Sequence, residues 1–112
     1  MRRAALVVLL AACEPGYGYQ ARLRDPADRP IEGATLAIAC SAERGFASSA
    51  MVKHTDVVGR ASSISIGAWQ PDCDLFIAKP GYRTQRLRAI DLCLGERHCS
   101  KVFDLDLVME PE

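Results

Sequence analysis

Cysteine is the residue type in this chain with the greatest chemical potential, and the 112-residue sequence holds five copies of it. No two of them have the Cys-x-x-Cys spacing, so neither a redox pair nor a cytosolic metal site is indicated. Exported chains of this size typically carry an even number of cysteines joined as disulfides. Setting Cys13 apart leaves four, which predicts export and two disulfides among Cys40, Cys73, Cys93 and Cys99.

Histidine, aspartate and serine give weaker signals. His54 precedes a turn, and His98 lies between the last two cysteines, which would hold a zinc ion only as reduced thiols. Asp104 and Asp106 share one strand face and are explained by exposure to solvent. The serines are scattered, and none has the glycine-flanked setting of a hydrolase nucleophile. We therefore predict no catalytic residue, no metal and no cofactor, and expect that the protein is not an enzyme.

The first twelve residues have the organisation of a secretion signal. Arg2 and Arg3 precede an uncharged apolar run from Ala4 to Ala12. As a helix this run would span about 14 Å, against about 30 Å for the hydrocarbon core of a bilayer. Residues 1–12 are therefore predicted to be a signal peptide and not a membrane-spanning helix.

The end of this leader resembles the lipobox of bacterial lipoproteins. Leu10-Ala11-Ala12-Cys13 has the leucine, the two small residues and the cysteine of that motif. The resemblance implies acylation (palmitate included) at Cys13, cleavage before it, and anchoring to a membrane of the cell envelope. Glu14 in place of an aspartate favours the outer membrane, with the domain in the periplasm or at the cell surface. Residues 13–18 would form a short tether.

The rest of the chain alternates in short runs separated by turn residues, which is typical of β-strands. One such run, Arg60 to Ile66, places Ser62, Ile64 and Ile66 on one face. No segment beyond the leader has a helical period. The pattern predicts an all-β, seven-stranded antiparallel Greek-key sandwich over residues 19–110, with strands near 19–24, 34–40, 51–55, 60–66, 73–79, 82–90 and 102–109.

Three short motifs, in order, resemble those of the carboxypeptidase regulatory-like domain, one of the transthyretin-like (prealbumin-like) sandwiches. They are Pro30-Ile31-Glu32-Gly33-Ala34, Thr55-Asp56-Val57-Val58-Gly59-Arg60 and Lys79-Pro80-Gly81-Tyr82. The residues expected to shape these turns are Gly33, Asp56, Gly59, Gly81 and Tyr82.

The resemblance also bears on the cysteines. Spacing leaves three connectivities open, and strand phase favours Cys40–Cys73 with Cys93–Cys99. In transthyretin-like sandwiches the second and fifth strands lie side by side, which would bring Cys40 near Cys73.

Such domains are folding, spacing or binding units, so we expect a membrane-anchored binding module whose partner is an envelope protein or a glycan. Trp69 and Phe76 are a candidate binding patch, although Trp69 would equally close one end of the core. A carbohydrate-binding or adhesion domain, using loops near Trp69 and residues 44–46, is one alternative. A small secreted hydrolase or inhibitor is another, favoured if a hollow joins His54 or His98 to an acid. With 14 basic and 14 acidic residues the chain has no basic patch, so nucleic acid is not an expected partner.

Overall fold

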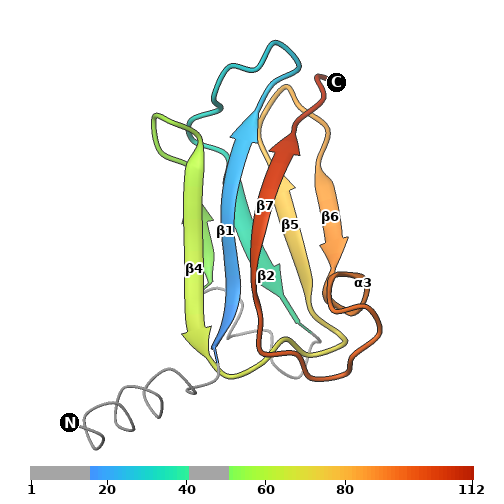
Figure 1. Cartoon of the computed structure of the whole chain (residues 1–112). Helices are drawn as coiled ribbons and strands as arrows, with labels where there is room; N and C mark the ends of the chain where they lie inside the picture. The colour runs from blue at the N-terminus through green and yellow to red at the C-terminus, as the bar shows by residue number, and fades with distance from the viewer. Residues whose placement is uncertain (1–15, 41–50) are drawn as a thin grey trace, which may run out of the picture.

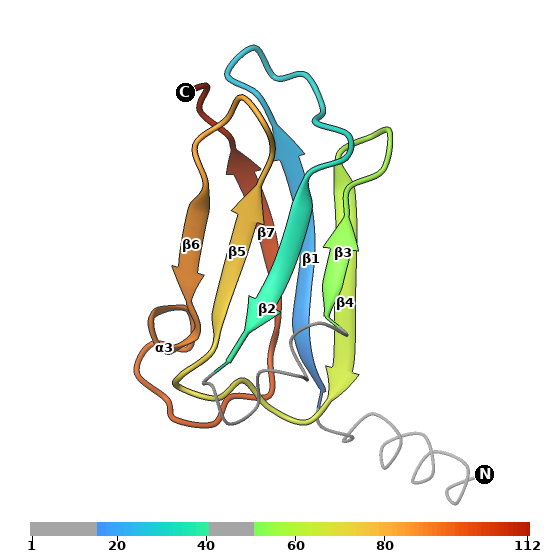
Figure 2. The same cartoon turned by 180° about the vertical axis from the view of Figure 1, so that it is seen from behind.

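The protein is a sandwich of two β-sheets in a computed structural model that describes residues 16–40 and 51–112 (Figures 1 and 2). One sheet has the strand order β4–β1–β7, with bounds Arg60–Ile66, Gly16–Arg24 and Val102–Val108. The other has the order β3–β2–β5–β6, with bounds Val52–His54, Thr35–Ala39, Asp74–Ala78 and Gln85–Arg88. The expected all-β class and two-sheet architecture are confirmed.

The core lies between the sheets and is built by alternate residues of the strands. In β1, Tyr19 and Leu23 are fully buried while Gln20 and Arg22 are exposed. This strand begins at Gly16, three residues before the boundary predicted at Tyr19. The same alternation in β2 and β5 buries Leu36, Ile38, Leu75 and Ile77.

The three-stranded sheet is mixed, so the prediction of a wholly antiparallel sandwich is wrong there. β1 pairs with β4 in the antiparallel sense and with β7 in the parallel sense. After β6 the chain crosses from one sheet to the other at the end where β1 starts, and β7 must then run in the direction of β1 (Figure 1). A crossover of this kind is what parallel neighbours require.

β4 turns its large apolar side chains toward solvent. Ser62, Ile64 and Ile66 share a face, as the alternation predicts, and that face is the outer one: Ile64 is 57% exposed and Ile66 is 80% exposed. The inward position is Ser63, which lies opposite Tyr19 in the β1–β4 register. Tyr19 is itself fully buried, so a large and a small side chain share this level of the core.

The run from Tyr82 to Ile90, predicted as one strand, is divided. β6 covers its middle, and the single helical turn α3 follows at Ala89–Leu92, so the expectation of no helix beyond the leader is wrong here. The turn is closed by Cys93, whose N–H donates to the Ala89 carbonyl at 2.8 Å. One turn is too short to produce a helical period in the sequence.

The connection from β3 to β4 is held by two side chains of the Thr-Asp-x-x-Gly motif. Buried Thr55 donates from Oγ1 to the Ile31 carbonyl at 2.7 Å and accepts the Ala34 N–H at 2.9 Å. Asp56 Oδ1 accepts the N–H groups of Val58 and Arg60 at 3.0 and 2.9 Å.

Glycine is required within the same turn. Gly59 has φ 79°, and a Cβ atom there would overlap the Leu23 carbonyl oxygen. A side chain at this position would therefore separate the turn from β1.

The two other predicted turns also contain left-handed glycines. Gly33 has φ 78° and Gly81 has φ 88°. Half-buried Tyr82 donates its N–H to the Lys79 carbonyl at 3.0 Å and forms a β-bridge with Pro111, so the late turn supports the C-terminal residues.

Two cysteine pairs are at disulfide distance. Cys40 follows β2 and Cys73 precedes β5, and these strands are antiparallel neighbours with Ala39 opposite Asp74. The adjacency that the resemblance implied is therefore present. Cys93 and Cys99 close the loop that leads from α3 toward β7.

Candidate functional site

The aromatic binding patch predicted at Trp69 is wrong, because this side chain is only 1% exposed. Its indole N–H donates to the Lys101 carbonyl at 3.1 Å, and its ring lies 5.5 Å from that of Tyr17 and 6.0 Å from that of Phe103, between centroids. The backbone of the segment is fixed as well, since the Trp69 N–H donates to the Cys99 carbonyl at 2.9 Å. Trp69 thus closes one end of the core, which is the alternative that the sequence left open.

Phe76 does not form an open platform either. Its half-buried ring is covered by the guanidinium of Arg86, whose carbon lies 5.8 Å from the ring centroid. Asp74 holds that guanidinium through a 2.8 Å ion pair. The specific observation that would have favoured an aromatic glycan site is therefore missing at both residues.

Other sequence candidates are placed as follows. Cys13, the leader at residues 1–12 and the loop at residues 44–46 lie outside the described residues. His98 is exposed on the loop between Cys93 and Cys99. Within residues 16–40 and 51–112, no three metal-ligating side chains are grouped, and no helix is long and apolar enough to cross a membrane.

The described surface has a shallow hollow on the outer face of the β4–β1–β7 sheet. Its volume is about 290 Å³. The outward side chains of three neighbouring strands line it: Gln20, Arg22, Arg60, Asp104 and Asp106. We call this site the arginine hollow.

The charges of the arginine hollow are separated by strand. Arg22 and Arg60 lie directly opposite each other in the β1–β4 register, so two cations face the same space. Asp104 and Asp106 line the hollow from β7, where Asp106 lies directly opposite Arg22 in the β1–β7 register. Like charges in directly opposed positions destabilise a sheet. Neither Arg22 nor Arg60 forms an ion pair within the described part of the chain.

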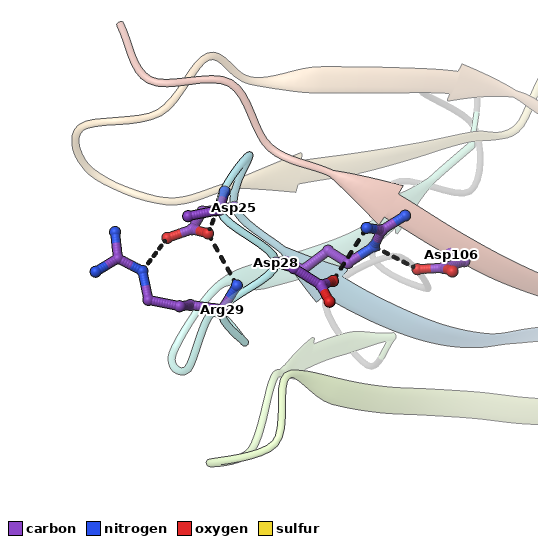
Figure 3. A network of polar contacts seen from close by, with 6 residues as sticks. Asp25, Asp28, Arg29 and Asp106 are labelled. Atoms are coloured by element: carbon purple, nitrogen blue, oxygen red, sulfur yellow. Dashed lines mark hydrogen bonds and ion pairs between the residues drawn. The ribbon is translucent and has the colours of Figure 1, made fainter.

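The acidic wall is partly neutralised by a third arginine. Arg24 donates to Asp106 and to Asp28, both at 3.1 Å, and these two contacts raise the pKa of its guanidinium (Figure 3). Asp106 Oδ1 is thereby bonded to Arg24, and the described residues show no ion pair between Asp106 and its register neighbour Arg22.

The turn beside this network is held in the same way. The N–H of Arg29 donates to Asp25 Oδ1 at 2.9 Å and lowers the pKa of that carboxyl, and the Arg29 side chain adds an ion pair at 3.0 Å (Figure 3). The end of β1 next to the hollow is therefore fixed by charge-assisted hydrogen bonds.

A second hollow of about 410 Å³ adjoins the first and shares Gln20 and Arg60 with it. It adds His54, Asp56 and Ser62 to the lining. His54 Nδ1 lies 3.3 Å from Thr35 Oγ1, and Asp56 accepts the two turn amides described above. A histidine and an acid therefore line one hollow, without a hydrogen bond between them among the described residues.

Sequence reasoning did not find the arginine hollow. The strand alternation places Gln20 and Arg22 on the outer face, and it does the same for Asp104 and Asp106. What it does not provide is the register that brings β4 and β7 to either side of β1. The residue types were visible in the sequence, but the pairing of strands that are far apart in it was not.

Comparisons with known proteins show similarity at the level of fold. No family model matches the sequence, and no curated protein matches it. The structure is similar to catechol 1,2-dioxygenase from Acinetobacter radioresistens, at a TM-score of 0.58 and 12% identity over 91% of this chain and 54% of that chain. For hydroxyquinol 1,2-dioxygenase from Pseudomonas putida the TM-score is 0.57 and the identity is 16%, over 88% of this chain and 57% of that chain. For a shaft pilin of Lactobacillus rhamnosus the TM-score is 0.51 and the identity is 13%, over 87% of this chain and 48% of that chain.

These neighbours correct the prediction that the protein is not an enzyme. That prediction rested on the lack of a recognisable catalytic set in the sequence, and it is overturned because the same fold occurs in dioxygenases. At 12% to 16% identity the likeness shows the fold alone. The chain spans about half the length of these solved proteins. This chain is thus a β-sandwich of an architecture that is found both in enzymes and in a pilin.

Proposed function

We propose that the protein is a lipid-anchored component of the bacterial cell envelope, and that its β-sandwich binds an anionic ligand in the arginine hollow. The observation that carries the anchor is the pairing of the cysteines. Cys40, Cys73, Cys93 and Cys99 are used in two pairs, which leaves Cys13 at the end of the lipobox-like tetrapeptide as the cysteine for acylation.

At the finer level of the fold, we propose a transthyretin-like Greek-key sandwich of the carboxypeptidase regulatory-like type. The neighbouring β2 and β5 support this, as do the three motifs that lie in the turns before β2, before β4 and before β6. The mature domain would start close to Gly16, where β1 begins.

The anchor is tested by growing cells that express the full chain with labelled palmitate. We expect label in the wild-type protein and none in Cys13→Ser. A Cys40→Ser/Cys73→Ser variant serves as a control for loss of cysteine in general and should keep the label. Label that persists in Cys13→Ser would refute the anchor.

The ligand site follows from the unpaired cations. Arg22 and Arg60 face one hollow together with the amide of Gln20, so two planar sets of N–H donors are presented to one ligand on the β1–β4 side, while Asp104 and Asp106 line the β7 side. Guanidinium groups bind carboxylates and phosphates through paired hydrogen bonds. The ligand class that this hollow fits is a carboxylate or phosphate group, such as the uronic acid of an envelope glycan.

The site is tested by titrating the protein with galacturonate and with inorganic phosphate while backbone amide signals are recorded by NMR. We expect shifts concentrated at Gln20, Arg22 and Arg60 that disappear in Arg22→Gln/Arg60→Gln. The matched control is Arg83→Gln/Arg88→Gln, which removes the same charge from exposed arginines outside the hollow. Equal shifts in both double variants would count against the site.

Hydrolysis is a second candidate, favoured by the adjoining hollow that holds His54 with Asp56 and Ser62. His54 Nδ1 faces Thr35, so its Nε2 is the nitrogen left to act on a bound substrate. We expect that wild-type protein and His98→Ala cleave p-nitrophenyl acetate at similar rates, and that His54→Ala, which has also lost one exposed histidine, cleaves it markedly more slowly. Equal rates in the wild type and both variants would exclude this candidate.

A further inference from the structure

The outer face of the β4–β1–β7 sheet ends in a small apolar surface made by Ile64, Ile66 and Val102. Their exposed fractions are 57%, 80% and 38%. In the register, Gly18 lies between Ile64 and Val102, and Gly16 lies opposite Ile66. Since the glycines present no side chains, the three apolar side chains border bare backbone. We call this surface the β1 entry patch.

The absence of a side chain at the centre of the patch is fixed by the fold. Gly18 has φ 145°, and a Cβ atom there would overlap the carbonyl oxygen of Ser63 on the neighbouring strand. The close approach of β1 to β4 therefore keeps this part of the face flat.

The isoleucines of the patch are placed against the usual energetic preference. Full burial of an isoleucine side chain stabilises a protein by about 1.5–3 kcal/mol, and β4 instead turns Ser63 toward the core. An outward Ile-x-Ile pair that borders bare backbone is therefore a surface that an apolar partner outside the sandwich would stabilise by covering it.

The short segment between Cys13 and β1 indicates which apolar partner would cover the patch. Gly16 follows Cys13 by three positions, and an extended chain reaches about 3.3–3.6 Å per residue. The patch begins at Gly16 itself, so an acylated Cys13 would hold it within roughly 10 Å of the lipid headgroups. Among the other exposed apolar side chains, Val57 and Val58 lie in the turn that leads into the opposite end of β4, and Leu94, 87% exposed, lies in the loop between α3 and β7.

We propose that the β1 entry patch rests in the headgroup region of the bilayer that holds the acyl groups of Cys13. This inference rests on the proposed anchor and adds an orientation to it. The sheet face with Ile64, Ile66 and Val102 is turned to the lipid at one end, and the arginine hollow is carried on the same face at the other end. Lys101, directly before Val102, is exposed and forms an ion pair with Glu96 at 3.8 Å.

The orientation is tested with tryptophan reporters in the acylated full-length protein. Ile66→Trp places an indole in the patch, and Val58→Trp places one at the opposite end of β4 as the matched control. Both proteins are reconstituted into vesicles of phosphatidylethanolamine and phosphatidylglycerol, with and without lipids brominated near the headgroup. Buried Trp69 contributes the same background to both.

We expect bromolipid to quench the added emission of Ile66→Trp at least roughly twofold more than that of Val58→Trp, as for a side chain seated at the interface. Equal quenching of the two reporters would overturn the inference. So would a concentration-dependent blue shift of Ile66→Trp without quenching, since it would show a second copy of the chain on the patch.

Palmitate labelling of the same samples distinguishes failure of the proposed anchor from failure of the proposed orientation. Labelled protein with an unquenched Ile66→Trp refutes the orientation alone. Unlabelled protein refutes the anchor, and the orientation with it.

Discussion

The hydroxyl of Thr55 connects the end of β3 to the backbone that leads into β2. It bonds the Ile31 carbonyl and the Ala34 N–H, and the residue is 4% exposed. Thr55→Val keeps the shape but leaves both backbone groups unsatisfied, so we expect the free energy of unfolding to fall by about 1–3 kcal/mol. Urea unfolding measures the change, and Thr55→Ser, which retains the hydroxyl, should lose less than half as much.

Tyr19, in contrast to Thr55, has a buried hydroxyl that forms no hydrogen bond among the described residues. Its ring is fully buried, and burial raises its pKa to about 12. Tyr19→Phe removes this unsatisfied group, and we expect it to raise the free energy of unfolding by about 1 kcal/mol at neutral pH. A measured loss of stability at pH 7 would show that the hydroxyl has a partner.

The raised pKa of Tyr19 also sets a pH dependence. Between the ordinary pKa near 10 and the folded value of about 12, the folded state holds a proton that the unfolded state has released. The wild type should therefore lose stability as the pH rises through this window, by about 1.4 kcal/mol per pH unit at the steepest. Tyr19→Phe should lack this component when both proteins are unfolded in urea between pH 9 and pH 11.

At the scale of elements, β4 contains a trade-off between stability and binding. Arg60 lies opposite Arg22, and relief of the repulsion in Arg60→Gln should raise the free energy of unfolding by about 0.2–1 kcal/mol at low salt. Arg60→Lys retains the charge and should show little gain. Thermal unfolding in added salt is the check, because screening should shrink the difference between the wild type and Arg60→Gln.

The elements also show how far the sequence reaches. Strict alternation, as in β1 and β5, was sufficient to predict both the strand and its buried face. In β4 the same alternation gave the strand but not the face that is buried, because that depends on how the strand pairs with β1. The parallel β1–β7 pair and the arginine hollow depend on contacts between strands far apart in sequence, and no local pattern encodes them.

At the scale of the whole molecule, the two disulfides should contribute differently to the free energy of unfolding. Cys40–Cys73 closes 33 residues and Cys93–Cys99 closes 6. On loop entropy alone, these cross-links stabilise by about 3–4 and about 2 kcal/mol. Cys40→Ser/Cys73→Ser should therefore lower the midpoint of thermal unfolding more than Cys93→Ser/Cys99→Ser. The reverse order, measured by calorimetry, would contradict the loop argument.

The parallel pairing of β1 and β7 has a mechanical consequence. The chain enters β1 at one end of the molecule and leaves β7 toward Glu112 at the other, with Gly18 beside Val102 and Arg24 beside Val108 (Figure 1). A pull between a fixed point before Gly16 and the far terminus would draw the two strands along each other in shear. The evenly spaced bonds of a parallel ladder then share the load and must break together, not one after another. Tension applied between its two ends is therefore the direction in which this domain yields last.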